Sequence, residues 1–113
     1  MTGKAKIEAG TDNIFADLGV PEAGPHFLKA QIVAELYRLA TTAKLTQAQI
    51  GKRLGISQPE VSRMFKGHFR EYSIERLMEF LTSFDRDIDI VVRPHKKAGK
   101  SGRITFRSGQ EAA

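Results

Sequence analysis

The 113-residue sequence contains no cysteine and no tryptophan. The absence of cysteine excludes disulfide bonds and thiolate metal sites. The histidines, at positions 26, 68 and 95, lie far apart and lack the spacing of metal ligands. No nucleophile, base and orienting group cluster along the chain. We therefore expect no metal, no cofactor and no enzymatic activity.

Long apolar runs are also missing. No run of about 18 apolar residues could form a membrane span, and no charged-then-apolar leader precedes the rest of the chain. We therefore expect a cytoplasmic protein that does not contact a membrane. With 113 residues, of which 41% are hydrophobic, the chain is long enough for one small helical domain with modest extensions.

Acidic residues are in the minority, with 13 against 18 lysines and arginines, and the pI is about 9.7. Positions 44–70 carry six bases and one acid, a net charge of +5, whereas positions 71–93 carry three bases and six acids, a net charge of −3. Positions 94–113 return to five bases and one acid, a net charge of +4. Concentrated positive charge suits the phosphates of a nucleic acid. The alternative is a merely soluble basic protein.

The positive stretch coincides with two short helical patterns joined by a tight turn. In the first pattern Ile50 and Leu54 lie one turn apart, and Gly51 between them leaves room for the second helix to approach. Gly55 suits the positive φ that ends a helix. This arrangement predicts a helix-turn-helix, whose second helix lies in the major groove of DNA.

The second pattern begins after Ser57, a suitable N-cap, and Pro59 fits its first turn. Val61, Met64 and Phe65 are spaced three and four residues apart and should face the core. The outward positions are the candidates for DNA contact. Those predicted to read bases are Gln58, Pro59, Glu60 and Arg63, and those predicted to contact phosphates are Gln47, Ser57, Ser62, Lys66, Lys52 and Arg70.

The chemistry of these side chains suits base reading. Glutamine can bond adenine through two hydrogen bonds, arginine can do the same with guanine, and glutamate can accept from the amino group of cytosine. Serine and lysine can hold phosphates. Taken singly, Gln58, Ser62 and Lys66 are each better explained as part of a solvated surface. Only their shared position on one helix favours DNA contact.

Helices should flank this motif on both sides. Residues 26–43 place apolar side chains three and four apart, with Val33, Tyr37 and Ala40 widening the apolar stripe. This helix should begin near Pro25. After the motif, Ser73 can cap a further amphipathic helix. We expect a mainly α domain of four to five helices around one core.

Residues 87–93 alternate aspartate and isoleucine before two valines, a period of two that predicts a β-strand. The strand could pair with residues 103–106 in a hairpin, or with its copy in a second subunit. We favour a two-fold dimer, because one short reading helix covers few base pairs. A dimer would place two reading helices on half-sites about 34–36 Å apart, and its operator would be palindromic.

The predicted organisation has four parts: a disordered tail at 1–12, a helical DNA-binding domain at 13–86, a strand or hairpin extension at 87–107, and a disordered tail at 108–113. Within 13–23 the chain is more apolar than a free tail should be. That segment either folds back on the core or docks a partner protein.

The run LTQAQIGKRLGISQPEVSRMFKG at 45–67 resembles the Cro/cI-like, or XRE-type, helix-turn-helix regulators. The wider run over residues 12–94 resembles a subgroup that includes HigA-type antitoxins, which neutralise RelE/HigB-like toxins and repress their own operons. The resemblance implies that Gln47 contacts a phosphate and supports the reading helix, with Gln58 and Arg63 as the main base readers. Pro59 would then contribute apolar contact, and Glu60 would either reject wrong sequences or stabilise the helix N-terminus.

The sequence is therefore consistent with two classes of function. The first is a dimeric DNA-binding regulator that represses its own gene, whether or not it also acts as an antitoxin. The second is a protein-interaction module that holds a toxin or another regulator without specific DNA binding.

Overall fold

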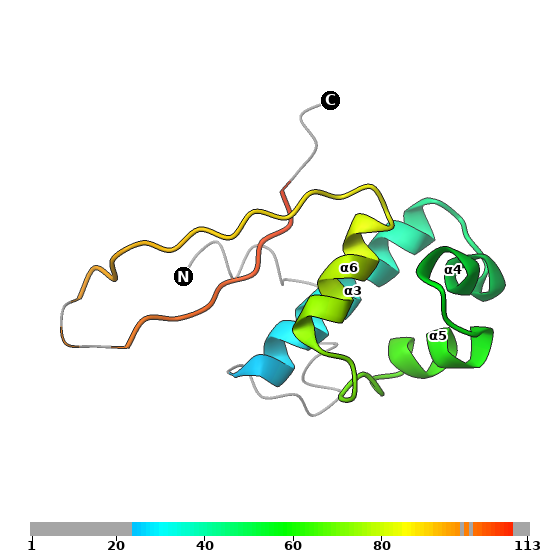
Figure 1. Ribbon diagram of the computed structural model, residues 1–113, viewed down its shortest axis with the longest axis horizontal. Helices are drawn as coiled ribbons and strands as arrows, with labels where there is room; N and C mark the ends of the chain where they lie inside the picture. The colour runs from blue at the N-terminus through cyan, green and yellow to red at the C-terminus, as the bar shows by residue number, and fades with distance from the viewer. Residues whose placement is uncertain (1–23, 98, 100, 110–113) are drawn as a thin grey trace.

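The computed structural model describes residues 24–97, 99 and 101–109. Within them lie four helices, α3 (Pro25–Thr42), α4 (Gln47–Leu54), α5 (Gln58–Phe65) and α6 (Ile74–Thr82). Helix α6 packs along α3, while α4 and α5 form a compact pair beside them (Figure 1). The described part of the chain is mainly helical, as predicted. None of its helices is long and apolar enough to cross a membrane.

Side-chain caps fix where three of the helices begin. The Thr46 hydroxyl accepts from the backbone N–H of Gln49 at 3.1 Å, and Gln49 Oε1 accepts from the N–H of Thr46 at 2.8 Å. Ser57 caps α5 in the same way, and the Ser73 hydroxyl caps α6. Such caps satisfy backbone donors that a helix leaves unpaired. Gly55 ends α4 at a φ of 79°. These boundaries confirm the sequence prediction.

The glycine inside α4 allows the close crossing of α4 and α5. A Cβ atom built on Gly51 would lie 2.5 Å from the carbonyl oxygen of Ile56 and 3.4 Å from a methyl group of Val61. The nearer contact is with backbone, which cannot rotate aside. The predicted close approach at Gly51 is confirmed.

One apolar core joins the four helices. Met64 and Val61 of α5, Leu36 of α3 and Leu77 of α6 are fully buried in it. The prediction for Tyr37 was wrong, since this side chain is 55% exposed. Its ring meets Phe65 edge-on, with the centroids 5.2 Å apart. Helix α5 therefore covers only one edge of the ring.

After α6 the chain leaves the helical body in an extended run, 86–97, and comes back in a second run, 101–109 (Figure 1). We call these two runs the arm. The predicted strand at 87–93 and its pairing with 103–106 are not observed in the described chain, where no β-ladder forms. The alternating sequence does give an extended backbone. A strand, however, also needs a partner that exchanges backbone hydrogen bonds.

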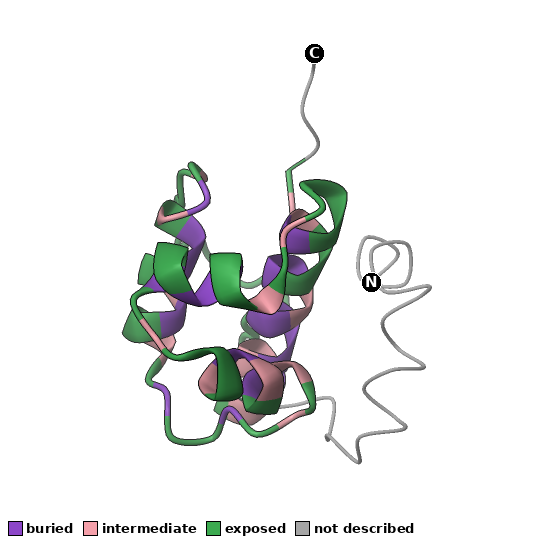
Figure 2. Ribbon diagram, turned by 90° about the vertical axis from the view of Figure 1, so that its right-hand side faces the viewer, coloured by how far each residue is buried: buried purple, intermediate pink, exposed green. Residues whose placement is uncertain are grey.

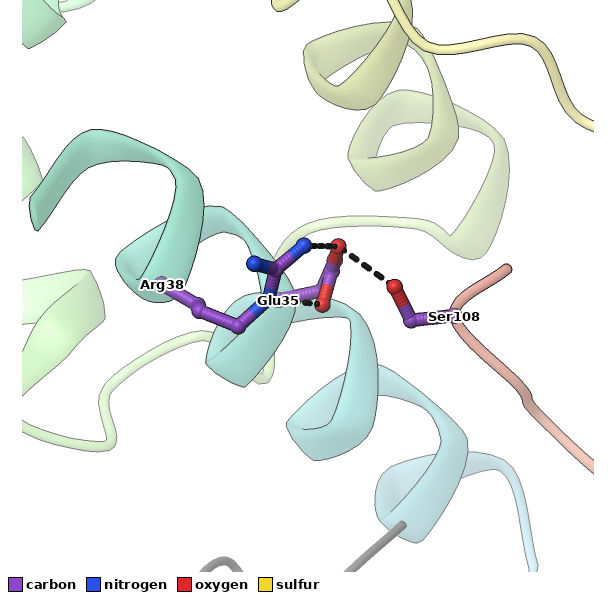
Figure 3. A network of polar contacts seen from close by, with 3 residues as sticks. All are labelled: Glu35, Arg38 and Ser108. Carbon is purple, nitrogen blue, oxygen red and sulfur yellow. Dashed lines mark hydrogen bonds and ion pairs between the residues drawn. The ribbon is translucent and has the colours of Figure 1, made fainter. Parts of the chain in front are cut away.

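The arm is attached to the helical body near both ends. Near its start, the guanidinium of Arg53 lies 5.0 Å from the ring centroid of Phe84 and 3.4 Å from a carboxylate oxygen of Asp85. Near its end, the Ser108 hydroxyl donates to Oε2 of Glu35 at 2.8 Å, and Glu35 also accepts from Arg38 (Figure 3). Phe106 packs against the core. The arm is thus held by α4 at one end and by α3 at the other.

Candidate nucleic-acid interface

Burial fixes which face of α5 meets solvent. Val61 and Met64 are both fully buried, so the helix cannot roll about its axis without exposing one of them. Figure 2 looks at the side of the molecule that carries α4 and α5 and colours the ribbon by burial, with exposed and buried residues on both helices. The outer side of α5 is therefore a fixed, solvent-facing surface.

The first residues of α4 and α5 are joined by their side chains. The amide nitrogen of Gln58 donates a hydrogen bond to Oε1 of Gln47 at 2.6 Å. The amide group of Gln47 keeps both of its N–H donors. Gln58 keeps its oxygen and one N–H, which are the acceptor and donor that pair with N6 and N7 of adenine. The contact orients Gln58 without using up its reading groups.

Glu60 is held back against the start of its own helix. Its Oε1 accepts from the backbone N–H of Ser57 at 2.9 Å, and its own N–H donates to the Ser57 hydroxyl at 3.2 Å. The hydrogen bonds to Ser57 lower the pKa of Glu60, and the nearby charge of Arg63 adds to this effect. These contacts favour the capping role expected for Glu60 over base reading.

The remaining base-reading candidates, Pro59 and Arg63, lie exposed on α5. Of the phosphate candidates, the structure places Ser57, Lys52, Lys66 and Arg70 at exposed positions and Gln47 and Ser62 at partly buried ones. Arg63 and the three basic phosphate candidates make no ion pair with any described residue. Their charges are available to an anionic partner.

Sequence reasoning missed the role of Lys29, which contacts the predicted phosphate-binding residue Arg70. The ammonium group of Lys29, on α3, donates to the backbone carbonyl of Arg70 at 2.9 Å. His26 stacks on Phe69 of the same loop, with ring centroids 4.9 Å apart, and burial lowers its pKa, helped by the charges of Arg70 and Lys29. Lys29 and Arg70 are 41 positions apart, so no local sequence pattern could reveal the contact. It fixes the loop that follows α5.

The arrangement matches what DNA recognition requires. A rigid helix presents an amide and a guanidinium toward solvent, with exposed lysine and arginine side chains around it. Across the described residues, no group of three histidines or carboxylates could hold a metal ion.

Comparison with known proteins gives two similarities. Residues 14–93 match the model of a family described as a helix-turn-helix domain. A solved protein that bears the name of an XRE family transcriptional regulator is 32% identical, with a TM-score of 0.72, and the alignment covers 79% of this chain and 100% of that one. No curated protein matches the chain.

Proposed function

Because the chain belongs to the XRE-type helix-turn-helix family, we propose that it is a sequence-specific transcriptional regulator that inserts α5 into the major groove of an operator as a homodimer. One observation carries this proposal: the hydrogen bond between Gln58 and Gln47, at the exposed start of a helix whose orientation is fixed by buried side chains. A helix surface without a binding role would not need the amide group of Gln58 to be held in one orientation.

Base reading is assigned to two side chains. Gln58 bonds an adenine, and Arg63, nearly one and a half turns further along α5, bonds the N7 and O6 acceptors of a guanine. Pro59 lies next to Gln58 and supplies apolar contact, for which a thymine methyl group is the natural partner. Each good bidentate pair contributes about 1–3 kcal/mol of discrimination.

Phosphate contacts surround the readers. Gln47 donates its amide hydrogens to a phosphate oxygen while its own oxygen holds Gln58. The other proposed phosphate contacts are Ser57, Ser62, Lys66, Lys52 and Arg70. These contacts position the protein and carry no sequence information.

The arm supports the dimer. An extended run with unpaired backbone groups is a template for another chain, and Ile90, Val92 and Ile104 on it are exposed. Side chains alternate along an extended chain, so Ile90 and Val92 share one face. Pairing with a second copy would cover these residues and supply the missing ladder. Two reading helices would then serve one palindromic operator, at which the protein represses its own gene.

The test is binding of the purified protein to a labelled DNA fragment from upstream of its own gene, with a scrambled fragment as control, at several salt concentrations. A dimer that contacts about eight phosphates should give a log-log salt slope near −7. Preference for the native fragment by about a thousandfold or more would support a specific autoregulator. Equal, weak binding to both fragments would contradict autoregulation at that site.

A second candidate function is favoured by an open cleft between α3, α4 and α5. The cleft has a volume of about 370 Å³, and the exposed ring of Tyr37 and the side chain of Phe65 line it beside Gln47. Exposed aromatic side chains are typical anchors for protein partners. In this alternative the chain neutralises a RelE/HigB-like toxin. Gln58→Ala separates the two functions, because it should weaken operator binding and leave capture of the toxin unchanged.

A further inference from the structure

The outer part of the arm carries an excess of positive charge. From position 93 to 109 the sequence has six lysines and arginines and no aspartate or glutamate. The described members of this group are all exposed: Arg93, Lys96, Lys97, Arg103 and Arg107. The acids of this region lie earlier, at Asp85, Asp87 and Asp89, next to the helical body. Charge is therefore segregated along the arm, with its basic part beginning where the acids end.

Four of these bases are not neutralised by an acid of the described chain. Arg93, Lys96, Lys97 and Arg107 form no ion pair with any described residue. Elsewhere in the molecule a basic side chain does form an ion pair: a guanidinium nitrogen of Arg38 lies 2.6 Å from a carboxylate oxygen of Glu35. A surface that only keeps a protein soluble mixes both signs of charge. Six bases without one acid suit a polyanion better.

The position of the arm gives the basic stretch a long reach. Figure 1 shows the outgoing run leaving the helices and the return run coming back to α3. Residues 86–97, at roughly 3.3 Å per residue, span up to about 36 Å. One turn of B-DNA is about 34–36 Å long. The outgoing run is therefore about as long as one turn of B-DNA.

The basic and apolar side chains of the arm need not compete. In an extended chain, residues two apart share a face. Arg103 and Arg107 therefore alternate with Ile104 and Phe106 along the return run, and Arg93 alternates with Val92 on the outgoing one. The apolar and the basic side chains of the return run can therefore be engaged at the same time.

We propose that the described bases of the arm form a second DNA-binding site, which takes the phosphate backbone of a duplex outside the base pairs that α5 reads. These bases are Arg93, Lys96, Lys97, Arg103 and Arg107. This inference rests on the proposed function and extends it. Lysine and arginine bind phosphates through charge and without regard to sequence. The arm therefore adds affinity and salt dependence but no base preference.

The experiment compares two labelled duplexes by fluorescence anisotropy. The short one contains the operator alone, and the long one adds about ten base pairs, one turn, on each side. The arm variant is Lys96→Gln with Lys97→Gln, and its matched control is Lys96→Arg with Lys97→Arg, which keeps both charges.

We expect the wild-type protein to bind the long duplex more tightly than the short one. The glutamine variant should lose this advantage and bind the short duplex like wild type, and the arginine variant should keep it. On the long duplex, the salt slope of the glutamine variant should shrink by about 0.9 for each phosphate that the arm no longer neutralises.

Either of two results would overturn the proposal: a glutamine variant that matches wild type on the long duplex, or one that loses affinity equally on both duplexes. Failure of the proposed function would look different. In that case the wild-type protein would not distinguish the operator from a scrambled sequence. The affinities of the wild-type protein and the glutamine variant could still be compared on a long and a short scrambled duplex.

Discussion

The amide nitrogen of Gln58 donates to Oε1 of Gln47 across 2.6 Å, and this bond links the first residue of one helix to the first residue of the other. One residue touches bases in the proposed complex, and the other touches a phosphate. A base reader and a backbone contact are thereby set at a fixed separation before DNA arrives.

The first prediction concerns this pair. Gln58→Ala should cost about 1–3 kcal/mol in operator affinity and relax specificity at one base pair. Gln47→Ala should also weaken binding, because Gln58 loses its orientation. Anisotropy titrations of both single variants and the double variant would give the coupling energy, which should be about 0.5 kcal/mol or more. Strict additivity of the two effects would show that the hydrogen bond has no role in recognition.

The second prediction concerns Gly51. Its missing Cβ would lie 2.5 Å from the carbonyl oxygen of Ile56, so Gly51→Ala should force α4 and α5 apart and lower the free energy of unfolding by about 1–3 kcal/mol. Chemical denaturation measures this change. Gly102→Ala is the matched control, because nothing lies within 4 Å of a Cβ there. A Gly51 variant as stable as that control would contradict the close crossing.

The third prediction is a pH dependence that arises from Glu60. Hydrogen bonds to Ser57 lower its pKa from the ordinary value of 4.5. The ionised carboxylate therefore adds stability above pH 4.5, and this contribution is lost as the pH falls through the lower folded-state pKa. Glu60→Gln should be less stable than wild type near pH 7, and the difference should shrink below pH 4.5.

Denaturation midpoints measured from neutral pH down to the acid range would test this dependence. Glu79→Gln is the control, because the carboxylate of Glu79 makes no hydrogen bond or ion pair with a described residue. A stability difference for Glu60→Gln that stays constant with pH would mean that the carboxylate does not stabilise the start of α5.

The fourth prediction concerns the end of the arm. Ser108→Ala removes the hydroxyl that donates to Glu35 at 2.8 Å, a bond that should contribute about 1 kcal/mol. Because Glu35 keeps its bond to Arg38, the helices should remain intact. Limited proteolysis should become faster in the return run of the arm and stay unchanged in α5. Ser101→Ala, at an exposed position, serves as the control.

Much of the helical body could be predicted from the sequence because its determinants are local. Thr46, Ser57 and Gly55 act within one turn of their own positions, and the apolar spacing of α5 sets its inner face. The outward placement of Gln58 and Arg63 follows directly. The hydrogen bond from Gln58 to Gln47 was expected only in outline, from the family resemblance.

The remaining features depend on contacts between distant parts of the chain. Ser108 and Glu35 are 73 positions apart, so no periodicity could connect them. The exposure of Tyr37 depends on where α5 ends. The apolar stripe of residues 26–43 cannot predict the position of another helix. The missing strand has a different cause. The alternating apolar and polar residues specify an extended backbone, but only a partner strand can supply the backbone hydrogen bonds of a β-ladder.

The attachment of the arm at both ends also affects how its length can vary. Arg53 fixes the outgoing run through Phe84 and Asp85, and Glu35 fixes the return run through Ser108. Residues added or removed between positions 97 and 101 would leave both anchors in place. Such changes would lengthen or shorten the arm while α5 keeps its orientation. In the proposed complex, the span of DNA that the protein covers would therefore vary independently of the base pairs that α5 reads.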